Sequence, residues 1–145
     1  MPGASAWRED GRLAKAGEVD EKALEELMEH SFFALKPPKS LDRWDFSLDA
    51  VADLTPEGGA ATLTEFTART VADAIQSMGA PVRILVTGGG RKNPAMMARI
   101  AAHMSCPVDP VESVGWDGDL MEAQAFAWLA ARSIRAEPLS LPSTT

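Results

Sequence analysis

Cysteine, long apolar runs and targeting signals are scarce or missing in this sequence of 145 residues. The single cysteine, Cys106, cannot form an internal disulfide, and this favours a reducing compartment over secretion. No segment approaches the roughly 20 apolar residues of a membrane-spanning helix. Residues 1–10 contain neither the basic nor the apolar region of a signal peptide. We therefore expect a cytoplasmic protein that does not associate with a membrane.

Positive charge is also in short supply. The chain has 14 Lys and Arg residues and 21 Asp and Glu residues, which gives a formal net charge of −7. A surface of this sign repels the phosphates of nucleic acids, so a nucleic-acid partner is not expected. The composition is otherwise that of an ordinary globular protein, and a chain of this length can form a core without disulfides or metals. The length allows one domain, or one lobe of something larger, over residues 1–145.

Capping signals and hydrophobic periodicity predict the order of the elements. Thr55-Pro56 and Asn93-Pro94 each place an N-cap residue before a proline, which is a signature of a helix start. In the first half we predict an Asp-Gly turn between extended pieces over 6–13, a helix after Asp20, a proline-rich loop over 36–40 and a short helix over 47–53. A long helix from 55 toward 78 and a strand over 82–87 follow. After a glycine turn we predict a helix from 93 to about 103, a strand over 107–111 and a last helix starting near 117–119.

This alternation predicts an α/β fold, with a parallel or mixed sheet covered by helices. The last helix is apolar on most of its circumference, so we expect it to be buried. The long helix is expected to pack on the sheet through the stripe Leu63, Phe66, Thr67, Thr70, Val71, Ala74 and Ile75.

Three consecutive glycines, Gly88, Gly89 and Gly90, follow the predicted strand over 82–87. Such a turn lets a ribose or phosphate approach backbone N–H groups near the start of a helix. A tight turn that needs positive φ explains the same residues without a ligand, and both explanations stay open. The run is not a dinucleotide fingerprint, because Asn93 stands where the third glycine would be, and no Gly-Lys-Ser/Thr of a P-loop is present.

A group of carboxylates, Asp117, Asp119 and Glu122, lies where the last helix is predicted to begin. Asp119 and Glu122 are three residues apart and therefore share a helical face, where they can hold the hydroxyls of a sugar. The same spacing is that of a capping box, in which Asp119 caps the helix and Glu122 reaches back to the cap. Sugar contact and capping both remain open at this point.

The other polar and aromatic candidates have simpler explanations. His30 and His103 lie at predicted helix ends, where an imidazole usually serves the C-terminal carbonyls, and two scattered histidines do not indicate a metal site. Lys39 and Arg43 can contact an anion in the proline-rich loop, although loop charges are more often solvated. Trp116 either stacks on a sugar or covers the core.

Taken in order, these motifs resemble the C-terminal part of anhydro-N-acetylmuramic acid kinase, a bacterial enzyme of peptidoglycan recycling. The resemblance is carried by Pro37-Pro38-Lys39-Ser40-Leu41-Asp42-Arg43 with Asp45-Phe46, Gly59-Ala60-Ala61-Thr62-Leu63-Thr64, Gly88-Gly89-Gly90 with Asn93-Pro94, Val114-Gly115-Trp116-Asp117-Gly118-Asp119 with Glu122-Ala123, and Pro138-Leu139-Ser140-Leu141-Pro142. It implies the second lobe of the actin-like, sugar-kinase ATPase fold, in which two α/β lobes close over ATP and substrate.

The resemblance also divides the candidate residues between two ligands. The adenosine side comprises Gly88, Gly89, Gly90 and Asn93, and the wall facing the sugar comprises Glu122 with Asp117 and Asp119 in support. In this family ATP, accompanied by Mg²⁺, phosphorylates the 6-oxygen of 1,6-anhydro-N-acetylmuramic acid while water opens the anhydro ring. The products are N-acetylmuramic acid 6-phosphate and ADP. No metal ligand is implied in this chain.

The family's phosphate-binding loop and the aspartate that activates water belong to an N-terminal lobe that this sequence does not contain. Phosphoryl transfer depends on positioning by both lobes, so we expect no catalytic residue here and no activity from the isolated chain. An N-terminal lobe or partner chain is the expected complement, and a homodimer of the full enzyme stays open. The alternatives are a stand-alone nucleotide- or sugar-binding module and an inactive remnant with an exposed apolar surface.

Overall fold

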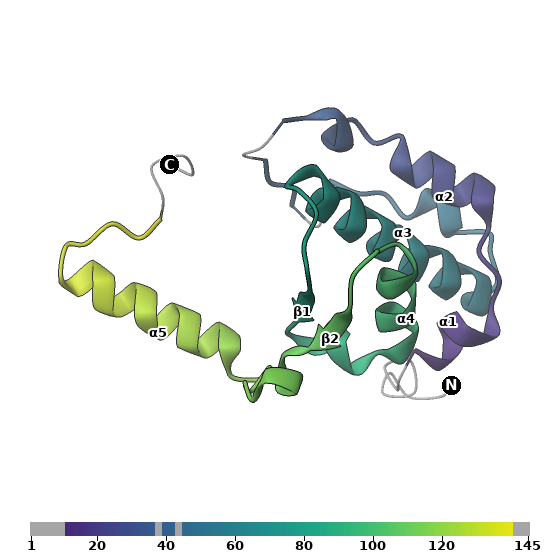
Figure 1. The fold of residues 1–145 in the computed structure, drawn as a ribbon. Coiled ribbons are helices and arrows are strands. Elements are labelled where there is room, and N and C mark those ends of the chain that lie inside the picture. Colours follow the sequence, from purple (N-terminus) through teal and green to yellow (C-terminus); the bar gives the residue numbers. More distant parts are fainter. Residues whose placement is uncertain (1–10, 37–38, 43–44, 141–145) are drawn as a thin grey trace, which may run out of the picture.

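The computed structural model describes residues 11–36, 39–42 and 45–140, and these form an α/β structure that is mostly helical. Figure 1 shows a group of helices beside a small sheet, with the last helix extending away from them. The elements are α1 (Arg12–Ala16), α2 (Glu21–Met28), η1 (Ser31–Ala34), η2 (Asp49–Val51), α3 (Pro56–Ser77), β1 (Ile84–Val86), η3 (Gly89–Lys92), α4 (Pro94–Ala102), β2 (Val108–Pro110), η4 (Val111–Val114) and α5 (Met121–Ile134), where η denotes a 3₁₀ helix.

The predicted helix starts are confirmed at three capping residues. Asp20 accepts a hydrogen bond from the N–H three residues ahead at 2.8 Å, and Thr55 does the same at 3.1 Å. Asn93 accepts two backbone N–H groups, at 3.0 and 3.1 Å. These bonds satisfy donors that have no partner inside the helix, which explains why α2, α3 and α4 begin where the sequence places them.

Helix α3 is the centre of the structure, and α1, α2 and α4 pack against it. Its buried side consists of small residues, namely Ala61, Thr62, Thr64, Ala68 and Ala72. The predicted stripe of larger residues is therefore wrong as the buried face, since Val71, Thr67 and Ala74 are exposed. Small side chains allow helix axes to approach closely, and α3 uses them to pack against other helices instead of a sheet.

Polar groups within this helical packing are satisfied. The Thr62 hydroxyl is completely buried, donates to the Gly58 carbonyl at 2.9 Å and accepts from the Asp20 N–H at 2.9 Å. This pair of bonds ties the start of α2 to α3. A hydroxyl buried without partners would cost free energy, so the two bonds explain why a threonine is tolerated there.

An ion-pair cluster joins α3 to α4. Glu65 accepts from Arg99 at 2.6 Å through one oxygen, and its other oxygen lies 2.5 Å from Nε2 of His103. Burial acts to raise the pKa of Glu65, but the hydrogen bonds from Arg99 and then His103 outweigh it, so the pKa lies below its ordinary value. The two helices are thus joined by a carboxylate that stays ionised.

Strands β1 and β2 form a parallel pair with Ile84 opposite Val108 and Val86 opposite Pro110. Both strands were predicted, and each is shorter than the sequence pattern suggested. Helix α4 connects them, as in a β-α-β unit. The glycine turn follows β1, while η4 and the acidic segment follow β2, so the two motifs meet at one edge of the sheet. Ligands of α/β folds bind at such carboxyl edges.

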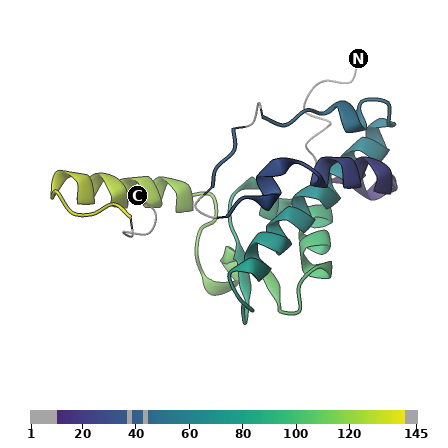
Figure 2. The ribbon, with the colours of Figure 1, turned by 90° about the horizontal axis from the view of Figure 1, so that it is seen from above.

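Two predictions for the outer parts of the chain are wrong. Residues 12 and 13 belong to α1 and are not extended, while residues 6–10 of the predicted turn lie outside the described part of the chain. Helix α5 contains no buried residue, although burial on most of its circumference was expected. Figures 1 and 2 both show α5 pointing away from the helical group, so this group does not cover it.

None of the helices in the described ranges combines the length and the apolar character needed to cross a membrane.

Candidate functional site

A pocket of about 500 Å³ opens at the carboxyl edge of the sheet. It is lined by Thr87, Gly88, Gly89, Gly118, Asp119, Met121, Glu122 and Ala125. One wall is the glycine turn, and the other is the acidic segment with the first turns of α5. The structure therefore brings together four of the predicted site residues, Gly88, Gly89, Asp119 and Glu122. Gly90, Asn93 and Asp117 are not among the lining residues, and their assignment stays a prediction.

The glycine turn is only partly explained by its own backbone. Gly88 has φ 73° and ψ −175°, a conformation that is essentially restricted to glycine. Gly89 and Gly90 have no positive φ, and a Cβ added at either would meet no atom within 4 Å. A tight turn thus accounts for one glycine of the three. Because Gly89 lines the pocket, the open space above it is room into which a ligand can approach the backbone.

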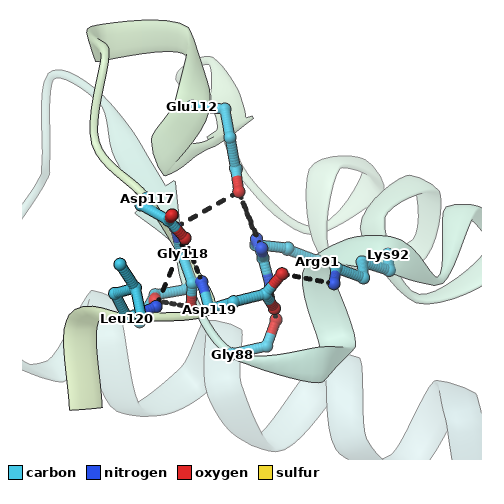
Figure 3. A network of polar contacts seen from close by, with 9 residues as sticks. Gly88, Arg91, Lys92, Glu112, Asp117, Gly118, Asp119 and Leu120 are labelled. Atoms are coloured by element: carbon cyan, nitrogen blue, oxygen red, sulfur yellow. Dashed lines mark hydrogen bonds and ion pairs between the residues drawn. The ribbon is translucent and has the colours of Figure 1, made fainter. Parts of the chain in front are cut away.

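Arg91 is a site residue that the sequence analysis missed. Its side chain is only 4% exposed and lies between Glu112, Asp119 and Gly88, as Figure 3 shows. Nη1 donates to the Gly88 carbonyl at 2.8 Å and to Oδ1 of Asp119 at 3.0 Å. Nε and Nη2 each lie 2.7 Å from Oε1 of Glu112. The available signal was the basic pair at positions 91 and 92 beside a glycine turn, in a chain with an acidic segment downstream.

The carboxylate of Asp119 faces the pocket with its charge already compensated. It binds Arg91 at 3.0 Å and Nζ of Lys92 at 2.6 Å. The hydrogen bond from Arg91, followed by that from Lys92, lowers the pKa of Asp119 to about 2. The pKa of Glu112 is also lowered, mainly by Arg91. Asp119 therefore anchors one wall of the pocket to the other.

The capping box, one of the two explanations left open for Asp119 and Glu122, does not form at the start of α5. The helix begins at Met121, its N-cap position falls on Leu120, and no side chain caps it. Asp117 instead accepts the N–H groups of Asp119 at 2.9 Å and Leu120 at 3.3 Å, which shapes the turn before the helix. The capping explanation fails because Asp119 is held by basic residues from another segment.

Glu122 lies in the first turn of α5 and lines the pocket. Within the described part of the chain its carboxylate has no hydrogen bond or ion pair. It is thus a free acceptor for hydroxyl or amide donors of a ligand.

Gly118 allows the acidic segment to lie directly on Arg91. A Cβ at this position would come within 2.6 Å of Cζ and 2.8 Å of Cδ of the arginine. The Gly118 N–H donates to Glu112 at 3.3 Å, and its carbonyl accepts from the Thr87 hydroxyl at 3.2 Å. Any larger residue would separate the two walls.

The weaker candidates have local structural roles. Lys39 donates to the carbonyls of Phe32 at 3.0 Å and Phe33 at 3.3 Å, so it serves the backbone of η1. Arg43 lies outside the described residues. Nδ1 of His30 accepts the Phe32 N–H at 3.2 Å, so this histidine caps the start of η1 and does not serve C-terminal carbonyls.

Trp116 is 55% exposed, so it does not cover a core, and it does not line the pocket. Among the described residues, no group of three or more His, Cys, Asp and Glu is arranged to hold a metal ion.

Comparison with known proteins gives a consistent result. The profile of one family, described as anhydro-N-acetylmuramic acid kinase, matches residues 3–145. A protein of that name from Paramagnetospirillum magneticum is 52% identical over 94% of this chain and 39% of its own length. The Caulobacter vibrioides protein of the same name is 50% identical over 99% of this chain and 39% of its own length. A third, from Rhodospirillum rubrum, is 53% identical over 94% of the chain and 36% of its own length. The chain thus spans well under half the length of these relatives.

Proposed function

The chain belongs to the anhydro-N-acetylmuramic acid kinase family, and we propose that it forms the C-terminal, ligand-facing lobe of such a kinase. The complete enzyme transfers the γ-phosphoryl group of ATP to the 6-oxygen of 1,6-anhydro-N-acetylmuramic acid, while water opens the anhydro ring. The observation that carries the proposal is the pocket itself, because it places the glycine turn opposite Glu122 at the carboxyl edge of the sheet.

The glycine turn is the wall that we assign to the nucleotide. The open space above Gly89 fits the close approach of a ribose or phosphate, and ATP supplies the phosphoryl group when it is bound. Gly90 and Asn93 stand behind this wall, where Asn93 fixes the start of α4. Mg²⁺ usually keeps several waters and is held by phosphates with one or two carboxylates, so it needs no cage of protein ligands in this lobe.

Glu122 is the residue that we assign to the sugar. Its carboxylate is unpaired within the described chain and accepts hydrogen bonds from hydroxyl groups. Asp117 and Asp119 support it indirectly, because Asp117 shapes the turn before α5 and Asp119 fastens that turn to Arg91 and Lys92. A specific hydrogen-bonding site of this type discriminates strongly between sugars that present the matching hydroxyl and those that do not.

The surface of α5 supports the proposal that the chain works as part of a larger protein. Leu120, Phe126, Trp128 and Ile134 are between 51% and 86% exposed. Large apolar side chains left exposed along one helix usually mark a surface that another segment covers. The sheet has two strands within the described ranges, and such a sheet is marginal unless it is extended or packed. We propose that the rest of the kinase covers α5 and supplies the base that activates water, so the isolated chain transfers no phosphate.

A stand-alone binding module is the second candidate. It is favoured by the fact that one chain alone forms both walls of the pocket. A module binds ADP tightly and melts in a sharp transition without ligand, whereas an inactive remnant shows no such transition.

Calorimetric titration of the chain with ADP and with the anhydro-sugar tests the assignment of the two walls. Gly89→Val fills the space above the turn and is expected to abolish ADP binding, while Ala80→Val, at an exposed loop position outside the lining, leaves binding intact. Glu122→Ala is expected to remove sugar binding, and Glu25→Ala, an exposed glutamate on α2, serves as its control. A folded chain that binds neither ligand would refute a preformed pocket in this lobe.

A further inference from the structure

We propose that Arg91 is a positioning residue that fixes the distance between the two walls of the pocket, the glycine turn and the Glu122-bearing start of α5. The inference rests on the proposed function, because it concerns how the nucleotide wall and the sugar wall are held at the right distance for their two ligands. Arg91 does not line the pocket. Its effect on the site is exerted through the residues that it holds.

The geometry of the guanidinium joins three segments of the chain. The single nitrogen Nη1 joins the two pocket walls, since it donates both to the Gly88 carbonyl at 2.8 Å and to Asp119 at 3.0 Å. The opposite edge of the same planar group is held by Glu112 of η4, with both distances at 2.7 Å. A rigid, planar donor fixed on both edges transmits the position of one wall to the other. Figure 3 shows the three partners converging on it.

Burial distinguishes Arg91 from an ordinary surface ion pair. Its side chain is 4% exposed, whereas its partners Glu112 and Asp119 are 47% and 59% exposed. The acidic segment therefore folds over the arginine, and Gly118 makes this possible by carrying no side chain. Exposed pairs gain little, because solvent screens them and the side chains lose freedom, but a buried arginine that binds two carboxylates and a carbonyl has a fixed geometry.

Helix α5 depends on this contact because its own side chains are not buried. The links from its leading turn to the sheet lie at Gly118 and Asp119, where Thr87, Arg91 and Lys92 bind. Glu122 follows Asp119 by three residues, which is less than one turn of helix. A change in how Arg91 holds Asp119 is therefore passed directly to the carboxylate that we assign to the sugar.

The chain offers a matched control arginine. Arg83 binds Asp109 at 2.8 Å and the Ser113 hydroxyl at 3.1 Å, so it also ties a strand to the β2–η4 region. Its side chain is 41% exposed, and neither it nor its partners line the pocket. Loss of an arginine contact elsewhere in the β1–β2 unit can thus be compared with loss of the contact between the walls.

The experiment measures backbone amide hydrogen exchange in the 145-residue chain and in Arg91→Met, Arg91→Lys and Arg83→Met. We expect Arg91→Met to speed exchange by about tenfold or more over residues 88–93 and 117–122, while exchange in α3 and α4 stays unchanged. Arg91→Lys restores protection only in part, because an ammonium group lacks the planar fork. In Arg83→Met, the exchange rates at both turns should equal those of the unchanged protein.

Unchanged exchange at both turns in Arg91→Met would overturn the proposal, and so would an equal increase throughout α3 and α4, which denotes a general structural role. If that variant fails to fold, Asp119→Asn decides, since it keeps the shape and weakens the same bridge. Unaltered exchange at residues 88–93 in Asp119→Asn would then refute the inference.

Titration with ADP and with the anhydro-sugar completes the test. Arg91→Met is expected to weaken binding of both ligands about tenfold or more, although Arg91 does not line the pocket. If the unchanged chain binds neither ligand, the proposed function fails in this lobe, and the exchange data still decide whether Arg91 joins the two turns.

Discussion

Replacement of Arg91 by methionine should raise the pKa of Asp119, and the size of the rise tests the description of the site. Arg91 and Lys92 lower this pKa from 3.8 to about 2, with Arg91 the larger cause. In Arg91→Met the contact with Lys92 at 2.6 Å remains, so the pKa should lie between these two values. In the double variant Arg91→Met/Lys92→Met it should return to about 3.8.

The difference is large enough to measure directly. At pH 3 a carboxyl with a pKa of about 2 is roughly 90% ionised, whereas one with a pKa of about 3.8 is roughly 14% ionised. Carbon-13 NMR of the Asp119 carboxyl across a pH titration reports this fraction, and circular dichroism defines the pH range over which the chain stays folded. Arg83→Met is the control and should leave the titration of Asp119 unchanged, because Arg83 binds Asp109.

The same pKa has a consequence for stability. A carboxylate whose pKa is lowered by folding stabilises the native state above the pKa of the unfolded chain, and this contribution is lost as the pH falls from about 3.8 toward about 2. Arg91→Met should therefore weaken the dependence of stability on pH in that window. A pKa of Asp119 that stays near 2 in Arg91→Met would refute the ion pair as the link between the walls.

Three further predictions concern the scaffold. Gly17→Ala should destabilise the chain by about 1–3 kcal/mol in urea unfolding, because a Cβ there meets the backbone carbonyl of Glu57, which cannot move aside. An unchanged midpoint of urea unfolding would contradict this close packing of α1 on α3. Glu65→Gln should lower the free energy of unfolding by about 1–3 kcal/mol at neutral pH, because it weakens the hydrogen bond with Arg99. Since the pKa of Glu65 is lowered, the difference in stability from the unchanged chain should shrink as the pH falls through that pKa. Asn93→Ala should cost about 1 kcal/mol by removing the cap of α4, with loss of protection in its first turn by hydrogen exchange.

Local chemistry made much of the fold predictable. An N-cap residue followed by proline acts over a few residues and needs no tertiary context, which is why the starts of α3 and α4 were predicted at Thr55 and Asn93. The face of α3 depends instead on what surrounds it. Its larger apolar residues suggested a sheet as the neighbour, but α1 and α4 approach the side formed by Ala61, Ala68 and Ala72.

The exposure of helix α5 could not be predicted from the sequence either. Phe126 and Trp128 gave it the composition of a buried helix, yet they are 64% and 55% exposed in the described chain. Periodicity states which residues need a partner surface, and it does not state which chain provides that surface.

The site was predictable as two separate motifs but not as one pocket. The glycine turn and the acidic segment were each identified from spacing, and their meeting follows from the parallel register of β1 and β2. The spacing of Asp119 and Glu122 fits both capping and ligand contact, so only the position of Leu120 at the N-cap could exclude the capping box. Arg91 was missed because burial of a cation depends on partners that lie 21 and 28 residues away.

The most direct test of the central claim is a phosphoryl-transfer assay with ATP, Mg²⁺ and 1,6-anhydro-N-acetylmuramic acid. It compares the 145-residue chain alone with a fusion in which the chain replaces the matching part of the Paramagnetospirillum magneticum relative, to which it is 52% identical. The full-length relative is the positive control. We expect no transfer by the chain alone, transfer by the fusion, and loss of that transfer in the fusion carrying Glu122→Ala. Transfer by the chain alone, or a folded fusion that is inactive beside an active relative, would contradict the assignment of this chain as one lobe of the kinase.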